Sequence, residues 1–181
     1  IERCRALLSD ANALQDWRIA IIHGQLPLDS QSAALHRCGP EHDGTVILAS
    51  GIAESSITID AVRLVIDSGL SRQLRYDPNT GMEGLETVPS SLASAEQRRG
   101  RAGRQSAGQC VRLWSPAEQQ RRPNFSPPEL LLTDPQPILM ELAQWGAGLG
   151  KDLPWLDAPP QAAMQEGLSD LQGLGLSLIH I

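Results

Sequence analysis

Three short apolar runs are the feature that most constrains the fold of this chain. They are RIAIIHG at 18–24, TVILAS at 45–50 and VRLVIDSG at 62–69, and each is typical of a short buried strand. Segments with helical spacing alternate with them, at 3–14 and at 28–37. Strands that alternate with helices predict an α/β fold with a parallel sheet. In such sheets the chemistry gathers where strands end and loops begin.

A change of pattern after these runs predicts a β-hairpin. RQLRY and LETV flank DPNTGMEG, whose Asp-Pro and Asn-Thr-Gly are turn-forming, so we expect residues 72–88 to form a hairpin that projects from the sheet. An ordinary extension of the sheet is the alternative. GQCVRLW at 108–114 fits a closing strand, and the prolines after it place a domain boundary near residue 116. Helical spacing in PILMELAQWG and AAMQEGLSDLQGLG then predicts a small helical region.

Composition limits the classes of function. The 181 residues carry a formal net charge of −6, which argues against coating nucleic acid through bulk charge, so any such contact must be local. No apolar stretch approaches the roughly 18 to 20 residues that span a bilayer, and the N-terminus lacks the layout of a signal peptide, so we expect a cytoplasmic protein with no membrane partner. The cysteines, Cys4, Cys38 and Cys110, form no CxxC pair and indicate neither a disulfide framework nor a metal site.

The segment AEQRRGRAGR at 95–104 concentrates positive charge in this acidic chain. It holds four arginines and two glycines in ten positions. Ser94 followed three residues later by Gln97 has the pattern of a capping box, which predicts that a helix begins at Ser94. A solvated, arginine-rich helix is the alternative to a binding site, and for an isolated motif both stay open.

The spacing within this segment predicts one functional face. On a helix, Gln97, Arg101 and Arg104 lie along a single side, and Gly100 lies on the same side. A glycine inside a helix costs about 1 kcal/mol relative to alanine, so the glycines indicate that another body approaches the backbone closely. A phosphate-bearing ligand fits, because the arginine fork matches phosphate oxygens and keeps its charge.

Four segments together resemble motifs IV, V and VI of the DEAH-box helicases of superfamily 2. They are IIHGQLPLDSQ, VILASGIAESSITIDAVRLVIDSG, YDPNTGM and SAEQRRGRAGR, within residues 20–115, and the later LWS, QWG and LPWLDAPP are similar to the bacterial HrpB-type branch. The resemblance implies a RecA-like parallel sheet, the second RecA-like or helicase C-terminal domain, at 1–115 without its first strand. A linker and winged-helix-like region at 116–158 and the start of a helical ratchet domain at 159–175 would follow.

The resemblance also implies which residues meet a nucleotide. In the family, the glutamine and the last two arginines of QRxGRxGR face the ATP phosphates, which here makes Gln97, Arg101 and Arg104 the catalytic candidates. Arg101 and Arg104 would act as arginine fingers, an effect worth about 10³ to 10⁵ in rate elsewhere. Gly100 would line the nucleotide, and Asp60 resembles the aspartate that contacts the ribose.

The same resemblance names candidates for nucleic-acid contact. Ser50 stands where the family usually has threonine, whose hydroxyl binds the nucleic-acid backbone, and Gly51 replaces a common asparagine. His23 and Gly24 lie on the motif IV loop near the nucleic-acid track, although a structural role for His23 is an equal alternative.

Three further charged residues have more than one interpretation. Glu54 either pairs with an arginine of motif VI or is simply solvated. Arg98 and Arg99 would point away from the nucleotide and make structural or interdomain contacts.

Two missing motifs limit the expected activity. The sequence has no GxxxxGK[ST] phosphate loop and no DEAH tetrapeptide, so a first RecA-like domain would have to supply the lysine and the Mg²⁺ ligands. We therefore expect an ATP-dependent helicase only in the full-length protein, with RNA a likelier substrate than DNA, and an inactive chain in isolation. A DNA helicase, a ribonucleoprotein remodeller and a non-enzymatic phosphate- or protein-binding module are the alternatives.

The last six residues have an unusual pattern. LSLIHI at 176–181 matches the translation of CTGTCTCTTATACACATC, a transposon end used in sequencing libraries. We expect these residues to be non-native, and a natural apolar helix end is the alternative.

Overall fold

The computed structural model describes residues 1–11, 14–36, 39–55 and 57–176. The chain forms two compact units: unit 1 comprises Ile1–Ser71 and Pro89–Phe125, and unit 2 comprises Arg72–Val88 and Ser126–Ile181. It passes between them at each foot of the segment predicted as a hairpin and again after Phe125. Residues 177–181, which include most of the segment expected to be non-native, lie outside the described residues.

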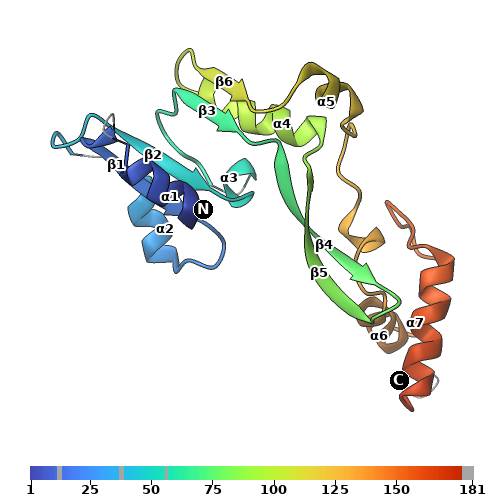
Figure 1. The fold of residues 1–181 in the computed structure, drawn as a ribbon. Helices are drawn as coiled ribbons and strands as arrows, with labels where there is room; N and C mark the ends of the chain where they lie inside the picture. Colours follow the sequence, from blue (N-terminus) through green and yellow to red (C-terminus); the bar gives the residue numbers. More distant parts are fainter. Residues whose placement is uncertain (12–13, 37–38, 56, 177–181) are drawn as a thin grey trace. The chain divides into compact units, whose positions relative to one another are not determined.

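The first part of unit 1 is a parallel pair of strands with two helices. Strands β1 (Trp17–Ile22) and β2 (Gly44–Ala49) are paired in parallel along their whole length. Helices α1 (Glu2–Ser9) and α2 (Leu28–Leu35) contact β1 (Figure 1). Both strands form where the apolar runs predicted them. The small core consists of Ala20, Ile22 and Ala34.

The second part of unit 1 carries the arginine-rich segment. Strands β3 (Leu64–Asp67) and β6 (Gln109–Arg112) are also paired in parallel. Helix α4 (Leu92–Arg99) contacts β3, and the short helix α3 (Ile52–Ser55) contacts α4. The prediction of parallel α/β pairing is confirmed. The described strands form two separate parallel pairs, however, because no strand bonds to both β2 and β3.

Unit 1 ends in a short capped helix, α5 (Pro116–Arg121). The hydroxyl of Ser115 accepts a hydrogen bond from the Glu118 amide (3.2 Å), and the Glu118 carboxylate accepts one from the Ser115 amide (2.7 Å). This reciprocal arrangement is a capping box. The Ser115 bonds lower the pKa of Glu118.

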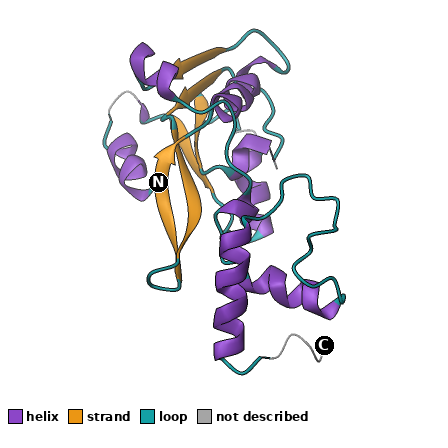
Figure 2. Ribbon diagram, turned by 90° about the vertical axis from the view of Figure 1, so that its right-hand side faces the viewer, coloured by secondary structure: helices purple, strands orange, loops and turns teal. Residues whose placement is uncertain are grey.

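Strands β4 (Leu70–Asp77) and β5 (Met82–Pro89) form the predicted hairpin, the long pair of strands in Figure 2. Its turn is built as the sequence indicated. The Asp77 carboxylate accepts a hydrogen bond from the Asn79 amide (2.9 Å), and Gly81 has a left-handed φ of 66° that favours glycine.

The remainder of unit 2 is helical, as predicted. It contains the 3₁₀ turn η3 (Glu129–Leu131) and helices α6 (Gln136–Gln144) and α7 (Gln161–Gly173). Among the helices of the described ranges, none combines the length and the apolar character needed to cross a membrane. The core of this unit consists of Leu139, Leu142, Met164 and Leu171.

Candidate functional site

The arginine-rich helix begins earlier than the sequence indicated. Its N-cap is Ser91, whose hydroxyl accepts a hydrogen bond from the Ser94 amide (3.2 Å), so α4 starts at Leu92. The predicted cap at Ser94 is wrong because Ser94 is buried in the first turn. Its hydroxyl donates to the Glu54 carboxylate (2.5 Å), a partner that local sequence cannot reveal.

The glycines of this segment lie at the end of the helix and not inside it. Helix α4 ends at Arg99, Gly100 is its C-cap, and a 3₁₀ turn, η2 (Gly100–Gly103), continues the chain. A Cβ built on Gly100 or on Gly103 would meet no heavy atom within 4 Å. The backbone here is therefore open to the approach of another molecule, although the reasoning from a mid-helix glycine does not apply.

The four residues expected on one face are not equivalent. Gln97, Gly100 and Arg104 are exposed, whereas Arg101 is only 8% exposed. Within the part of the chain that the structure describes, the side chains of Gln97 and Arg104 make no hydrogen bond or ion pair. They are thus available to a ligand, while Arg101 is turned inward.

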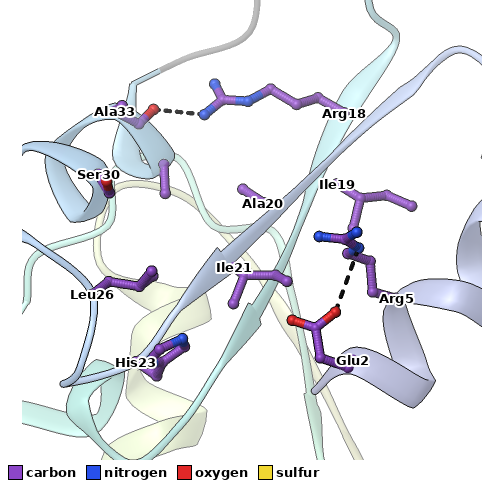
Figure 3. Close-up of a pocket in the computed structure, with 11 residues that line it drawn as sticks. Glu2, Arg5, Arg18, Ile19, Ala20, Ile21, His23, Leu26, Ser30 and Ala33 are labelled. Atoms are coloured by element: carbon purple, nitrogen blue, oxygen red, sulfur yellow. Dashed lines mark hydrogen bonds and ion pairs between the residues drawn. The ribbon is translucent and has the colours of Figure 1, made fainter.

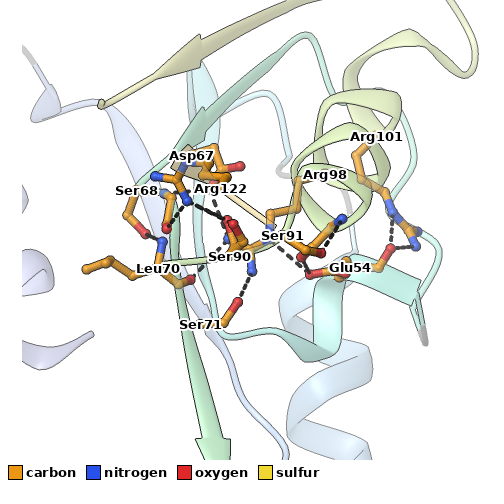
Figure 4. Close-up of polar contacts among 12 residues, drawn as sticks. Glu54, Asp67, Ser68, Leu70, Ser71, Ser90, Ser91, Arg98, Arg101 and Arg122 are labelled. Carbon is orange, nitrogen blue, oxygen red and sulfur yellow. Dashed lines mark hydrogen bonds and ion pairs between the residues drawn. The ribbon is translucent and has the colours of Figure 1, made fainter. Parts of the chain in front are cut away.

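Arg101 holds the motif V loop, which we define as residues 50–60. Its Nε donates to the carbonyl oxygen of Glu54 (3.0 Å), and its Nη2 donates to the same oxygen (Figure 4). Its Nη1 donates to the carbonyl oxygen of Ile57 (2.5 Å). Burial, followed by the positive charge of Arg104, lowers the pKa of the Arg101 guanidinium. The positive charge of Arg104 thus disfavours the charged form of Arg101 through space, with no hydrogen bond between the two side chains.

Arg98 links the helix to the same loop and to β3. Its Nε donates to the Glu54 carboxylate (3.0 Å), and its Nη1 donates to the buried carboxylate of Asp67 (2.9 Å; Figure 4). Burial opposes the charge of Arg98, but the hydrogen bonds to Asp67 and Glu54 outweigh it and raise the pKa. Of the two interpretations of Glu54, pairing with a motif VI arginine is the one observed. These contacts agree with a structural role for Arg98.

Arg99 points to a different set of partners. Its Nε donates to the Glu96 carboxylate (2.6 Å), which also accepts a hydrogen bond from Arg112. The bond from Arg112 is the main cause of the lowered pKa of Glu96. Arg99 and Glu96 are both exposed, so this pair lies on the surface of the helix.

Asp60 lies at the end of the motif V loop and is tied to the residue that follows Arg104. Its carboxylate accepts a hydrogen bond from Gln105 Nε2 (2.8 Å), and Gln105 Oε1 accepts one from the Ala61 amide (2.9 Å). Ala61 has a left-handed φ of 57°, uncommon for a residue other than glycine. Gln105 was not predicted, and its position directly after the arginine motif is the only local signal for it.

The nucleic-acid candidates leave the sheet at one edge. The last residues of β1 and β2, Ile22 and Ala49, are register partners, so His23 and Gly24 leave the sheet beside Ser50 and Gly51. The Ser50 amide donates to the Ile22 carbonyl (3.0 Å), which fixes the two loops together. A Cβ on Gly24 or on Gly51 would meet no heavy atom within 4 Å.

A separate hollow of about 350 Å³ lies between α1, β1 and α2 (Figure 3). His23 lines it, but no residue of the arginine motif does. Its most prominent cation, Arg18, donates to the carbonyl oxygens of Ala33 (2.6 Å) and His36 (2.7 Å). That guanidinium is occupied by the backbone, and the other charged pair of the lining, Arg5 and Glu2, forms an ion pair (3.7 Å; Figure 3). Across the described ranges, histidine, cysteine and acidic side chains form no group of three that could hold a metal ion.

Comparison with known proteins gives the same family over the same segments. The model of the helicase conserved C-terminal domain matches residues 1–106. The ATP-dependent RNA helicase HrpB of Escherichia coli K12 is 40% identical over 160 residues, which cover 88% of this chain and 20% of HrpB. The HrpA homolog of Haemophilus influenzae, also named an ATP-dependent RNA helicase, is 34% identical over 90% of this chain and 12% of its own length.

Solved structures agree with this result. A crystal structure of the E. coli DExH-box NTPase HrpB superimposes with a TM-score of 0.80 at 38% identity, covering 88% of this chain and 20% of HrpB. The chain thus spans about a fifth, or less, of the length of these relatives. With more than half of its residues matched by the family model and this likeness in sequence and structure, the chain belongs to the helicase conserved C-terminal domain family.

Proposed function

We propose that this chain is the C-terminal motor portion of an ATP-dependent RNA helicase, in which hydrolysis of a nucleoside triphosphate is coupled to unwinding or translocation. One observation carries the proposal: Arg104 and Gln97 are exposed and unpartnered among the described residues, beside the open backbone of Gly100. Such an arrangement presents a cation and an amide to a ligand that lies outside this chain. The names of HrpB and HrpA, both ATP-dependent RNA helicases, support ATP and RNA as that chemistry.

The residues present fit one side of a site for ATP. The guanidinium of Arg104 is free to bind phosphate oxygens with two hydrogen bonds, and the amide of Gln97 offers both a donor and an acceptor. Asp60, held by Gln105, provides an ordered carboxylate for a ribose hydroxyl. Bound ATP supplies the phosphoryl group that is transferred, and a first RecA-like domain of the same full-length protein would hold the Mg²⁺.

The two proposed arginine fingers differ in readiness. Arg104 meets the phosphates directly in this proposal, because nothing in the described residues competes for it. Arg101 holds the carbonyl oxygens of Glu54 and Ile57, so it acts as a finger only after it has given up those bonds. In the conformation described, Arg101 positions the motif V loop.

RNA would lie along the edge where β1 and β2 end. Ser50 offers an exposed hydroxyl, and Gly24 and Gly51 allow a sugar–phosphate backbone to come close to theirs. His23 is half-buried and belongs to the same edge. A strand held here meets a loop that Arg101 and Arg98 tie to the nucleotide-facing helix. We place this activity in the cytoplasm, and we retain the RecA-like, winged-helix-like and ratchet domain boundaries as predictions.

Measurement of ATP hydrolysis by the full-length protein tests this function. Turnover is compared without nucleic acid, with single-stranded RNA and with DNA of the same sequence. Stimulation by RNA supports the proposal. Stimulation by DNA alone favours a DNA helicase, and absence of ATPase activity under all three conditions favours a non-enzymatic binding module.

A further inference from the structure

One guanidinium group joins the two ends of the hairpin, residues 69–71 and 89–90, which we call its feet. Just outside β4 and β5, the Ser90 amide donates to the Gly69 carbonyl (2.9 Å). Nη1 of Arg122 donates to that same Gly69 oxygen (2.7 Å) and to the carbonyl oxygen (2.9 Å) and hydroxyl (3.3 Å) of Ser90. Figure 4 shows Arg122 beside Ser90. Within the described residues, this side chain adds its hydrogen bonds to the Ser90–Gly69 backbone bond and to the pairing of β4 with β5.

The guanidinium of Arg122 packs closely against Trp114 and Gly69. Its guanidinium carbon is 4.0 Å from the ring centre of Trp114, within the range of a cation–π contact. The indole of Trp114 is fixed in turn, because its Nε1 donates to Gln119 Oε1 (2.7 Å). Gly69 has a left-handed φ of 70°, and a Cβ there would overlap both Arg122 Nη2 and the Trp114 ring. Only glycine therefore leaves room for this guanidinium.

The residues after Arg122 hold the start of the arginine-rich helix. The amides of Leu92 and Ala93 lie in the first turn of α4 and have no acceptor within the helix. They donate instead to the carbonyl oxygens of Pro123 (2.8 Å) and Asn124 (3.0 Å). The segment from Arg122 to Asn124 thus contacts both the hairpin feet and the helix that carries Gln97 at its other end.

A second arginine, Arg98 of α4 itself, links the helix to the start of the hairpin. Besides its bonds to Glu54 and Asp67, Arg98 donates from Nη1 to the Leu70 carbonyl (3.1 Å) and from Nη2 to the Ser71 hydroxyl (2.9 Å). Leu70 and Ser71 are the first residues of β4. The helix that faces the proposed nucleotide is therefore fastened to the foot of β4 directly and to both feet through the segment around Arg122.

We propose that Arg122 is a positioning residue that couples the nucleotide-facing helix α4 to the β4–β5 hairpin, an inference that rests on the proposed motor function. Arg122 is not among the residues that would touch ATP or RNA. Its contribution is to make the hairpin feet follow α4 when the helix shifts during the ATP cycle. Without it, the feet keep the Ser90–Gly69 backbone bond, the pairing of β4 with β5 and the contacts of Arg98, so hydrolysis proceeds while less of the motion reaches the hairpin.

The experiment compares Arg122→Ala with Arg121→Ala in the full-length protein. Arg121 is the adjacent, exposed arginine, and its side chain makes no hydrogen bond or ion pair in the described residues, so the control removes the same charge without touching the hairpin feet. The readouts are ATPase activity without RNA and the number of base pairs of an RNA duplex unwound per ATP hydrolysed. Amide hydrogen exchange at Ser90 reports on the feet themselves.

In Arg122→Ala, basal ATPase activity is expected to stay near that of the unaltered protein, and base pairs unwound per ATP are expected to fall about fivefold or more, a usual size for coupling between sites. Exchange at Ser90 becomes faster. Arg121→Ala changes none of these. Arg122→Lys restores the coupling only in part, because an ammonium group lacks the planar fork that stacks on Trp114 and reaches both carbonyl oxygens.

Two results overturn the inference: unwinding per ATP that is unchanged in Arg122→Ala, or basal ATPase activity and unwinding that fall together in both Arg122→Ala and the milder Arg122→Lys. The second result indicates that the residue is needed only for folding. If the unaltered protein shows no RNA-stimulated ATPase activity, the proposed function fails instead. In that case, amide exchange at Ser90 in Arg122→Ala still tests whether Arg122 holds the hairpin feet together.

Discussion

Replacement of Arg101 by alanine tests whether this side chain holds the motif V loop. The substitution removes every donor that Arg101 gives to the carbonyl oxygens of Glu54 and Ile57. Arg104→Ala is the matched control. It removes the same kind of side chain three residues after Arg101, from a position that is exposed and unpartnered in the described chain.

The structure sets the size of the effect. A buried acceptor that loses its partner costs about 1 to 3 kcal/mol, so the two carbonyl oxygens together give about 2 to 6 kcal/mol. Glu54 and Ile57 are only partly buried, and water replaces some of the lost bonding, so the lower end applies. A cost of about 2 kcal/mol raises the local opening equilibrium about 30-fold. Arg104→Ala changes stability by less than about 0.5 kcal/mol.

Native-state hydrogen exchange in the full-length protein measures this opening. The amides of Ala53 and Glu54 donate to the carbonyl oxygens of Ser50 (3.2 Å) and Gly51 (2.9 Å), so their exchange reports on the loop that Arg101 holds. We expect exchange at both amides to be about 30-fold faster in Arg101→Ala. Exchange that is equally slow in Arg101→Ala and Arg104→Ala would refute the reasoning, and would leave Arg101 with the role of a direct phosphate contact alone.

Three further predictions concern the helix and its surroundings. Ser91→Ala removes the N-cap of α4 and is expected to destabilise the helix by about 1 kcal/mol, seen as faster amide exchange at Ser94, and unchanged exchange there contradicts the assignment. Gly108→Ala places a Cβ on the backbone oxygen of Ala102 and is expected to lower the melting temperature, whereas Gly103→Ala, with open space at its Cβ, leaves it nearly unchanged; equal melting temperatures count against the described packing. Because the Arg112 hydrogen bond lowers the pKa of Glu96 in the folded state, its stabilisation is complete above the ordinary glutamate pKa and is lost as the pH falls below it. The difference in melting temperature between the unaltered protein and Glu96→Gln should therefore shrink from pH 7 towards acid, and a difference independent of pH refutes the pairing.

Local patterns were sufficient to predict most of the fold. The strands β1, β2 and β3 and the hairpin follow from apolar runs and turn residues, which act over a few positions. The cap of α4 was misplaced because the partner that removes Ser94 from the capping position is distant in sequence. Ser94 bonds to Glu54, 40 residues away, and the amides of Leu92 and Ala93, in the first turn of the helix, bond to the carbonyl oxygens of Pro123 and Asn124.

The residues predicted to share one face of the arginine helix do not all do so, because the α-helix ends before Arg101. Spacing of 3.6 residues per turn places Arg101 and Arg104 on the side of Gln97. The α-helix ends at Arg99, and a 3₁₀ turn continues only to Gly103, so the regular α-helical spacing does not extend to Arg104. Arg101, inside the turn, is buried, and Arg104, after it, is exposed. Arg122 lies in the segment assigned from the sequence to a linker and winged-helix-like region, and nothing near it in the sequence indicates that it reaches the hairpin feet.

The central claim is that the exposed Arg104 faces the phosphates of a nucleotide held by another part of the full-length protein. Single-turnover ATP hydrolysis with saturating RNA tests it most directly, with Arg99→Ala as the control, since Arg99 pairs with Glu96 on the surface of the same helix. We predict that Arg104→Ala slows hydrolysis by about 10³- to 10⁵-fold, as loss of an arginine finger does, while Arg99→Ala hydrolyses ATP nearly as fast as the unaltered protein. Hydrolysis by Arg104→Ala at the unaltered rate would contradict the account.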